Sequence, residues 1–381
     1  MKTLITDDFQ VFIKPIGARC NLQCSYCYYL PNTDIFKPDV NPIMTNETLE
    51  NYIQQHYLAS TSDTVLFTWH GGEPLLAGIE FYEKALSIQR KYLPAGKSFV
   101  NAIQTNGTML TKEWCEFLAA NKFSVGISMD GPETFHNAMR HTPNKSGSFE
   151  KTLRGYHLLR EQGITAEILC VVNAFNVRYP LAVYEFFKSL GTKYISFLPL
   201  VERINKENSQ VSPESVPAFE FGLFLAAVFD EWVKSDIGTI KIQIIEEALR
   251  TAFHQEHSLC IFRECCGGIP VIEHNGDFYS CDHYVGKNQS LGNINEHPLA
   301  YWLNHPVQKA FGDTKRDTLP QYCIRCEVRD MCNGECPKNR FITSPDGEPG
   351  LNYLCDGYDY FFNHIKPFVL SVAEAWKKNH S

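Results

Sequence analysis

The chain has 381 residues, 44% hydrophobic and 20% charged, which suits one large domain or two ordinary ones and argues against disorder. Its formal net charge of -8 argues against non-specific nucleic-acid binding, which needs a basic surface. The N-terminal stretch MKTLITDDFQVFIKPIG has no apolar signal-peptide core, and no apolar run is long enough to span a bilayer. We therefore expect a cytoplasmic protein that binds neither membrane nor nucleic acid.

Strand-like and helix-like segments alternate in the first half of the chain. The strand-like runs are Phe9–Ile16, Thr64–Trp69, Ser98–Ile103, Phe123–Ser128, Ala166–Val172 and Tyr194–Val201. Helical spacing occurs at Asn46–Leu58, Gly78–Tyr92, Lys112–Ala120, Phe149–Gln162 and Leu181–Leu190, and Thr45 resembles an N-cap. Six β–α units in series predict a parallel sheet, either doubly wound or curled into a barrel.

The second half of the chain has a different character. A polar linker, Glu202–Pro217, precedes an amphipathic helix at about Ala218–Lys234. From about Ser258 the alternation stops and cysteines become frequent, while Tyr358–Lys378 reads as a closing helix. We expect a core domain over residues 1–240 and a loop-rich, metal-binding domain over residues 241–381.

Fourteen cysteines in a cytoplasmic chain indicate metal binding, because disulfides are rare there. Cys20, Cys24 and Cys27 form a CxxxCxxC motif directly after the first strand. Three thiolates can hold three irons of a 4Fe–4S cube and leave the fourth iron open to an amine and a carboxylate. A structural zinc site is the alternative, but it would want a fourth ligand and paired CxxC spacing.

Polar motifs follow the next strands. They are WHGGEP at 69–74, QTNGT at 104–108 and SMDGP at 128–132. The carboxyl ends of barrel strands are where β/α barrels build active sites, so these motifs belong on the face that holds the cysteine loop.

The nine later cysteines are Cys260, Cys265, Cys266, Cys281, Cys323, Cys326, Cys332, Cys336 and Cys355. Two closed 4Fe–4S clusters need eight thiolates. Zinc ribbons and a ferredoxin-like carrier are the alternatives. The CxxC-x5-C-x3-C spacing does not match paired ribbons, and a carrier would not need the preceding core.

CxxxCxxC with an aromatic residue before its last cysteine, followed by GGEP, resembles the radical S-adenosylmethionine (SAM) enzymes. This resemblance implies a partial (β/α)6 TIM-like barrel in which SAM is cleaved reductively at the open iron. It also implies the SAM-contacting residues, which are Tyr26, Gly72, Ser128, Arg140 and Val201.

The later cysteines are similar to the SPASM pattern, which binds two auxiliary clusters. That resemblance implies one ligand set of Cys260, Cys266, Cys281 and Cys336, and a second of Cys323, Cys326, Cys332 and Cys355. Cys265 competes with Cys266, and the spacing to Gly276 favours Cys266. Cys115 and Cys170 fall in a predicted helix and strand and are expected to be ordinary buried residues.

The segments KPIGARCNLQCSYCYYL, WHGGEP, VGISMDGP, YSCDHYV and YLCDGY resemble those of anaerobic sulfatase-maturating enzymes. The resemblance implies oxidation of a Cys or Ser in a sulfatase's CxPxR-type motif to Cα-formylglycine, with three clusters, SAM and a donor such as flavodoxin or ferredoxin.

It also implies that Asp282 is the general base, with His283 as a rival, and we expect burial beside a negative cluster to raise the pKa of Asp282. Some members have Gln in place of His70. Two other functions stay open. One is a peptide maturase that forms crosslinks, and the other is an iron–sulfur scaffold or electron carrier.

Overall fold

The computed structural model describes residues 9–35, 43–205 and 209–380. The start of the chain and residues 206–208 of the expected linker lie outside this part. The chain forms two compact units, Met1–Ser128 with Met139–Ala166 and Gly267–Gly312, and Met129–Ala138 with Glu167–Cys266 and Asp313–Ser381. Both units draw on residues from either side of position 240, so the division expected there stays a prediction about function.

A parallel sheet organises the first unit. Its strands β1 (Val11–Ile13), β2 (Thr64–Trp69), β3 (Ser98–Thr105) and β4 (Ser124–Ser128) pair in sequence order. Each lies within a run predicted from the sequence, except that β3 extends two residues further. The helices α1 (Asn46–Ala59), α2 (Ile79–Tyr92), α3 (Lys112–Ala120) and α5 (Phe149–Glu161) also form where helical spacing predicted them. The Thr45 side chain accepts a hydrogen bond from Thr48 N, which confirms the N-cap.

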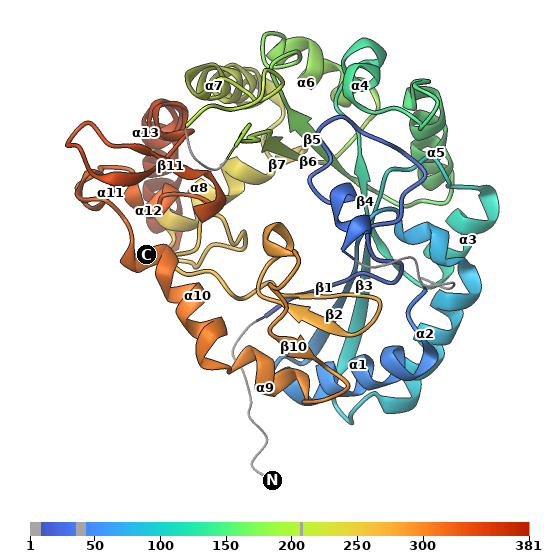
Figure 1. Ribbon diagram of the computed structural model, residues 1–381. Helices are drawn as coiled ribbons and strands as arrows, with labels where there is room; N and C mark the ends of the chain where they lie inside the picture. The colour runs from blue at the N-terminus through green and yellow to red at the C-terminus, as the bar shows by residue number, and fades with distance from the viewer. Residues whose placement is uncertain (1–8, 36–42, 206–208, 381) are drawn as a thin grey trace. The chain divides into compact units, whose positions relative to one another are not determined.

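The segment after Ser258 is more regular than expected. Strand β8 (Val271–Ile272) extends the first unit's sheet by pairing in parallel with β1, and β9 (Asp277–Tyr279) and β10 (Gly292–Asn293) follow in antiparallel fashion. The helices α9 (Leu299–Leu303) and α10 (Pro306–Asp317) come next, and α9 lies beside α1 (Figure 1). The prediction of a loop-rich segment is therefore wrong here, because strands of two or three residues leave too short a pattern to recognise.

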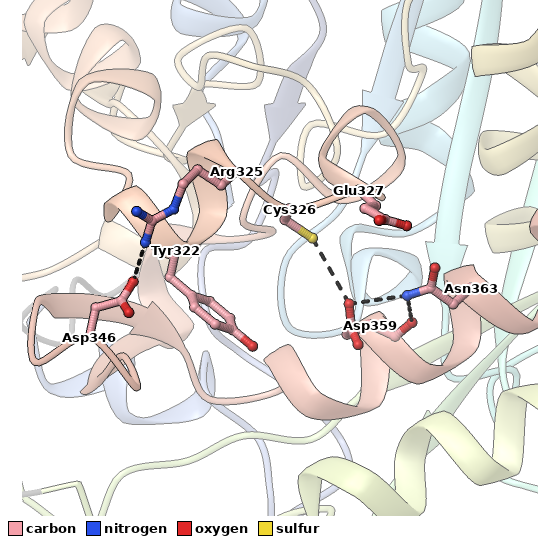
Figure 2. A pocket seen from close by; sticks show the side chains of 7 residues that line it. All are labelled: Tyr322, Arg325, Cys326, Glu327, Asp346, Asp359 and Asn363. Atoms are coloured by element: carbon pink, nitrogen blue, oxygen red, sulfur yellow. Dashed lines mark hydrogen bonds and ion pairs between the residues drawn. The ribbon is translucent and has the colours of Figure 1, made fainter.

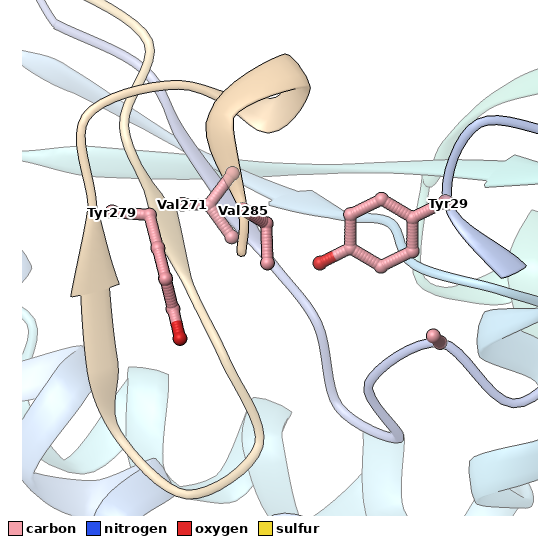
Figure 3. Close-up of a cluster of buried hydrophobic side chains, with 5 residues drawn as sticks. Tyr29, Val271, Tyr279 and Val285 are labelled. Atoms are coloured by element: carbon pink, nitrogen blue, oxygen red, sulfur yellow. The ribbon is translucent and has the colours of Figure 1, made fainter. Parts of the chain in front are cut away.

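A buried apolar cluster joins this late segment to the cysteine loop within the first unit. Tyr29, from the loop, shares the cluster with Val271, Tyr279 and Val285 (Figure 3). The Tyr29 hydroxyl also donates a hydrogen bond to the fully buried Glu273 carboxylate. Apolar burial and this hydrogen bond therefore fix the loop against the segment that carries Cys281 and Asp282.

The second unit combines a short parallel sheet with packed helices. Strands β5 (Glu167–Val172), β6 (Tyr194–Pro199) and β7 (Lys241–Ile242) pair in order. Its helices include α6 (Pro180–Ser189), α7 (Ala218–Ser235), α8 (Gln243–Ala252), α11 (Gln321–Ile324), α12 (Arg329–Cys332) and α13 (Cys355–His380), and a hairpin is formed by β11 (Arg340–Thr343) and β12 (Pro349–Asn352). The short helix α4 (Glu133–Met139) spans the point where the chain passes between the units.

Two glycines let α7 and α13 come into close contact (Figure 1). A Cβ added at Gly222 would lie 2.3 Å from the Gly357 carbonyl oxygen, so both positions need glycine. Cys355 is the first residue of α13, and this packing therefore positions one of the predicted cluster ligands. No helix in the described part of the chain has the length and apolar character to cross a membrane.

Candidate active site

The CxxxCxxC loop follows β1, as predicted. Backbone N–H groups of Leu22 and Leu30 donate to the sulfurs of Cys20 and Cys27, at 3.4 and 3.3 Å. Burial, followed by the charges of Glu73 and the two other motif cysteines, raises the pKa of the Cys20 thiol to about 12. Three thiolates crowded in this way repel one another unless iron compensates their charge, so the donor set fits a cluster. Among the described residues, no three His, Cys, Asp or Glu side chains are placed around a single metal ion.

The GGEP segment is packed directly on this loop. Gly72 N donates to Gly17 O at 3.0 Å and Glu73 N to Arg19 O at 2.8 Å. A Cβ at Gly72 would lie 2.0 Å from Arg19 O, so no larger residue fits without moving the loop. The buried Glu73 carboxylate in turn accepts from Thr105 Oγ1 at 2.7 Å and Asn106 N at 2.8 Å. Through these contacts the structure brings the GGEP and QTNGT motifs to the cysteine loop.

Three further predicted SAM contacts lie in the first unit. Arg140 is buried, and its guanidinium lies 5.3 Å from the centre of the Tyr26 ring. Ser128 ends β4, and its hydroxyl accepts from Gln104 Nε2 at 3.1 Å. Val201 is buried but belongs to the second unit. Tyr26, Gly72, Ser128 and Arg140 therefore share a unit with the cysteine loop, and contacts to SAM stay a prediction for all five.

Asp282 is held by residues that the sequence analysis did not single out. Its Oδ1 pairs with Lys14 Nζ at 2.5 Å, and its Oδ2 accepts from the Tyr28 hydroxyl. Both partners flank the cysteine loop, Lys14 at the end of β1 and Tyr28 directly after Cys27. The exposed fraction of Asp282 is 8%, and Lys14 is fully buried. The proposed base is thus fixed beside the cysteine loop, whereas His283 is exposed.

The pKa of Asp282 runs opposite to our expectation. Burial raises this pKa, but the charge of Lys14 outweighs burial and places the pKa well below its usual range. The carboxyl is therefore ionised at neutral pH and can accept a proton, although as a weaker base than expected. The only sequence signal for this was a lysine directly after an apolar strand, and such residues are ordinarily exposed.

His70 completes the surroundings of Lys14. Its ring stacks on Phe12, with centroids 4.9 Å apart, and burial lowers its pKa to about 3. Lys14 Nζ and Gly71 N both lie within 3.0 Å of His70 Nδ1, which must accept from them. The neutral ring consequently carries its proton on Nε2.

The second unit holds most of the auxiliary cysteines. Burial raises the pKa of Cys355, as do the neighbouring thiols of Cys332, Cys323 and Cys326, so these four lie together as predicted. Cys260 is influenced in the same way by Cys266, whereas the Cys265 sulfur accepts from Arg316 at 3.5 Å. These contacts favour Cys266 over Cys265 as a ligand.

The remaining cysteines divide between the two units. Cys336 lies in the second unit and Cys281 in the first. Cys115 and Cys170 are fully buried in α3 and β5, as expected.

A pocket of about 380 Å³ opens beside Cys326 (Figure 2). It is lined by Tyr322, Arg325, Cys326, Glu327, Asp346, Asp359 and Asn363. The Asp359 carboxylate lies 4.0 Å from the Cys326 sulfur, and Arg325 pairs with Asp346 at 2.5 Å. The second predicted ligand set therefore has one thiol that faces solvent.

Comparisons with known proteins agree with this geometry. Residues 15–186 match the radical SAM superfamily, and residues 260–327 match an iron–sulfur cluster-binding domain named SPASM. A serine-type anaerobic sulfatase-maturating enzyme of Bacteroides thetaiotaomicron is 43% identical, over 94% of this chain and 90% of the relative. A cysteine-type enzyme of Clostridium perfringens is 31% identical, over 95% of this chain and 98% of the relative. This chain belongs to the anaerobic sulfatase-maturating enzymes.

Solved structures support the same family and fold. The structure of native anSMEcpe with bound AdoMet and a Cp18Cys peptide has a TM-score of 0.87 and 30% identity, and the match covers 96% of this chain and 99% of that one. The peptide-bound SuiB of Streptococcus suis has a TM-score of 0.61 at 16% identity, which is a likeness of fold alone. The predicted radical SAM fold with a C-terminal SPASM domain is confirmed, and so are SAM and iron–sulfur clusters as cofactors.

Proposed function

We propose that this protein oxidises a serine or cysteine in a CxPxR-type sulfatase motif, or its serine counterpart, to Cα-formylglycine. The single observation that carries the proposal is the Asp282 carboxylate, buried and ionised beside the CxxxCxxC loop. Higher identity to a serine-type relative, 43% against 31% for a cysteine-type one, favours serine. The electron that starts each turnover would come from a donor such as flavodoxin or ferredoxin.

The cofactors would be held by eleven cysteines. Cys20, Cys24 and Cys27 would hold the cluster that binds SAM, and the two auxiliary sets would take the ligands predicted above. When bound, the cluster and SAM supply a 5′-deoxyadenosyl radical that removes one hydrogen atom from the substrate Cβ. The Tyr26–Arg140 pair and the packed GGEP backbone would orient SAM, and Arg140 suits a carboxylate because its guanidinium can bind in bidentate fashion.

The chain's own chemical step is proton transfer. Oxidation of the side chain to an aldehyde also removes the hydroxyl or thiol proton and one electron. Asp282 would accept this proton, since it is ionised and pairs with a buried cation that keeps it so. Tyr28 donates to the second carboxylate oxygen and therefore fixes its orientation.

The proposal is tested with two peptides that differ only in Ser or Cys at the target position, incubated anaerobically with reconstituted protein, SAM and reductant. We expect loss of two hydrogens from the Ser peptide, or replacement of SH2 by O in the Cys peptide. Fragmentation should place the change on the target residue, and the product should react with a hydrazide. A peptide with Ala at that position is the control.

The alternatives give different results. A crosslinking maturase would also remove two hydrogens, but fragmentation would link two residues and no aldehyde would form. A scaffold or electron carrier would leave both peptides and SAM intact. Replacing Cys20, Cys24 and Cys27 together by Ala should remove about one third of the iron and all SAM cleavage, because one of three cubes is lost.

A further inference from the structure

Two buried cations of the second unit lie among the auxiliary cysteines. Lys315 is fully buried, and its Nζ donates to Cys260 O at 2.9 Å and to Ile261 O at 2.7 Å. Burial lowers the Lys315 pKa, and the thiols of Cys266 and Cys260 act in the opposite direction. An ammonium here therefore faces the part of the first auxiliary set that this unit contributes.

Arg340 holds the link between the two auxiliary sets. Three successive residues separate Cys332 of one set from Cys336 of the other, and all three have positive φ, namely Asn333 (46°), Gly334 (67°) and Glu335 (50°). The Arg340 guanidinium donates to the carbonyl oxygens of these three residues, at 2.7, 2.8 and 3.3 Å respectively. A left-handed run of this kind persists only where its surroundings fix it, and Arg340 does so.

Arg340 also connects this link to Lys315, since its Nη1 donates to Lys315 O at 2.5 Å. Burial lowers the Arg340 pKa, while the neighbouring thiols of Cys323, Cys332 and Cys266 raise it. One guanidinium is thus close to thiols of both predicted sets. Glu335 is the opposing buried charge, and its Oε2 accepts from Asn352 at 2.6 Å and Asn339 at 3.0 Å. Two cations against one carboxylate leave net positive charge among the ligands.

We propose that Lys315 and Arg340 are positioning residues that set the reduction potentials of both auxiliary clusters, with Arg340 also fixing the ligand link Cys332–Cys336. The inference rests on the auxiliary clusters of the proposed function. A cluster gains negative charge on reduction, so a fixed cation nearby favours the reduced form and raises the potential. In a buried site, solvent screens this effect only weakly.

The test uses the full chain with Cys20, Cys24 and Cys27 replaced by Ala, so that the remaining iron signal belongs to the auxiliary clusters. Lys315→Met, Lys315→Arg and Arg340→Lys are made in this background, and the auxiliary potentials are measured by redox titration followed by EPR. Lys234→Met is the matched control, because Lys234 is an exposed lysine of the same unit paired with Glu231.

We expect Lys315→Met to keep about eight irons, four per cluster, and to lower the auxiliary potentials, most for the cluster nearest Cys260. Lys315→Arg and Lys234→Met should leave the potentials at the parent value. Arg340→Lys keeps the charge but loses the fork, so it should keep the potentials and lose iron on dilution. If Lys315→Met is insoluble, Lys315→Gln replaces it with the same expectation.

Unchanged potentials in a fully loaded Lys315→Met protein would overturn the proposal, as would an equal decrease in Lys234→Met. A background protein without auxiliary iron would instead overturn the cluster assignment on which the proposal rests. The two failures are thereby distinguished before any potential is measured.

Discussion

The ion pair between Lys14 and Asp282 gives the sharpest prediction. Lys14→Met removes the charge but keeps much of the apolar stem, and leaves a buried carboxylate without its cation. Removing one partner of a buried ion pair costs about 3–5 kcal/mol. We therefore expect the free energy of unfolding to fall by about that amount at neutral pH, where the Asp282 carboxyl is ionised in the parent protein.

The same substitution should impair catalysis for a related reason. Without Lys14, burial alone acts on the Asp282 pKa and raises it, by up to about 3–5 units for a fully buried carboxyl. A base that already holds a proton cannot accept another. Formylglycine formation should therefore fall by about a hundredfold or more, while SAM cleavage to 5′-deoxyadenosine continues.

The dependence on pH has a definite sign. In the parent, the lowered Asp282 pKa contributes stability that is complete above the unfolded value of about 4 and is lost as the pH falls toward the folded value. In Lys14→Met the raised pKa reverses the sign, so the variant should gain up to about 1.4 kcal/mol of stability per unit as the pH falls below that pKa. The stability difference between parent and variant should thus be smaller at pH 6 than at pH 8.

The assay pairs anaerobic unfolding of reconstituted protein with the ratio of formylglycine to 5′-deoxyadenosine. Lys91→Met is the control, because the Lys91–Glu50 pair at 2.9 Å is exposed and such pairs contribute about 1 kcal/mol or less. Lys14→Met combined with Asp282→Asn should recover stability but not activity. Parent-like stability and product yield in Lys14→Met, or a double variant as unstable as Lys14→Met alone, would refute the reasoning.

Three further predictions concern the same reaction and its supports. Asp282→Asn should reduce formylglycine by about a hundredfold while SAM cleavage continues, and normal product by mass spectrometry would remove Asp282 as the base. Gly72→Ala brings its Cβ to 2.0 Å from Arg19 O and should slow SAM cleavage by about a hundredfold, because the cysteine loop must move. Gly96→Ala, where a Cβ meets nothing within 4 Å, should leave cleavage rates unchanged. Cys332→Ala should lower soluble yield, since cluster binding contributes folding free energy, and a parent-like melting curve would contradict this structural role.

The sequence alone determined the features that depend on local spacing. The six strands and five helices predicted in the first half form where expected, because their apolar patterns span several turns or whole strands. The CxxxCxxC, GGEP and SPASM spacings indicated the cofactors, since ligands held by a short loop are defined by their separation along the chain. Strands as short as β8 escaped prediction, because two residues carry no period.

Tertiary structure decided the electrostatics of the site. Lys14 and Asp282 are 268 residues apart in the chain, and no local pattern joins them (14 and 282). The sequence placed Asp282 beside a cluster ligand and so suggested a raised pKa, whereas packing of the late segment on β1 brought a buried lysine to it and lowered that pKa. Arg340 was likewise unmarked until folding aimed its guanidinium at the Cys332–Cys336 link. Charge interactions depend on distance and burial, and only the folded chain sets these two quantities.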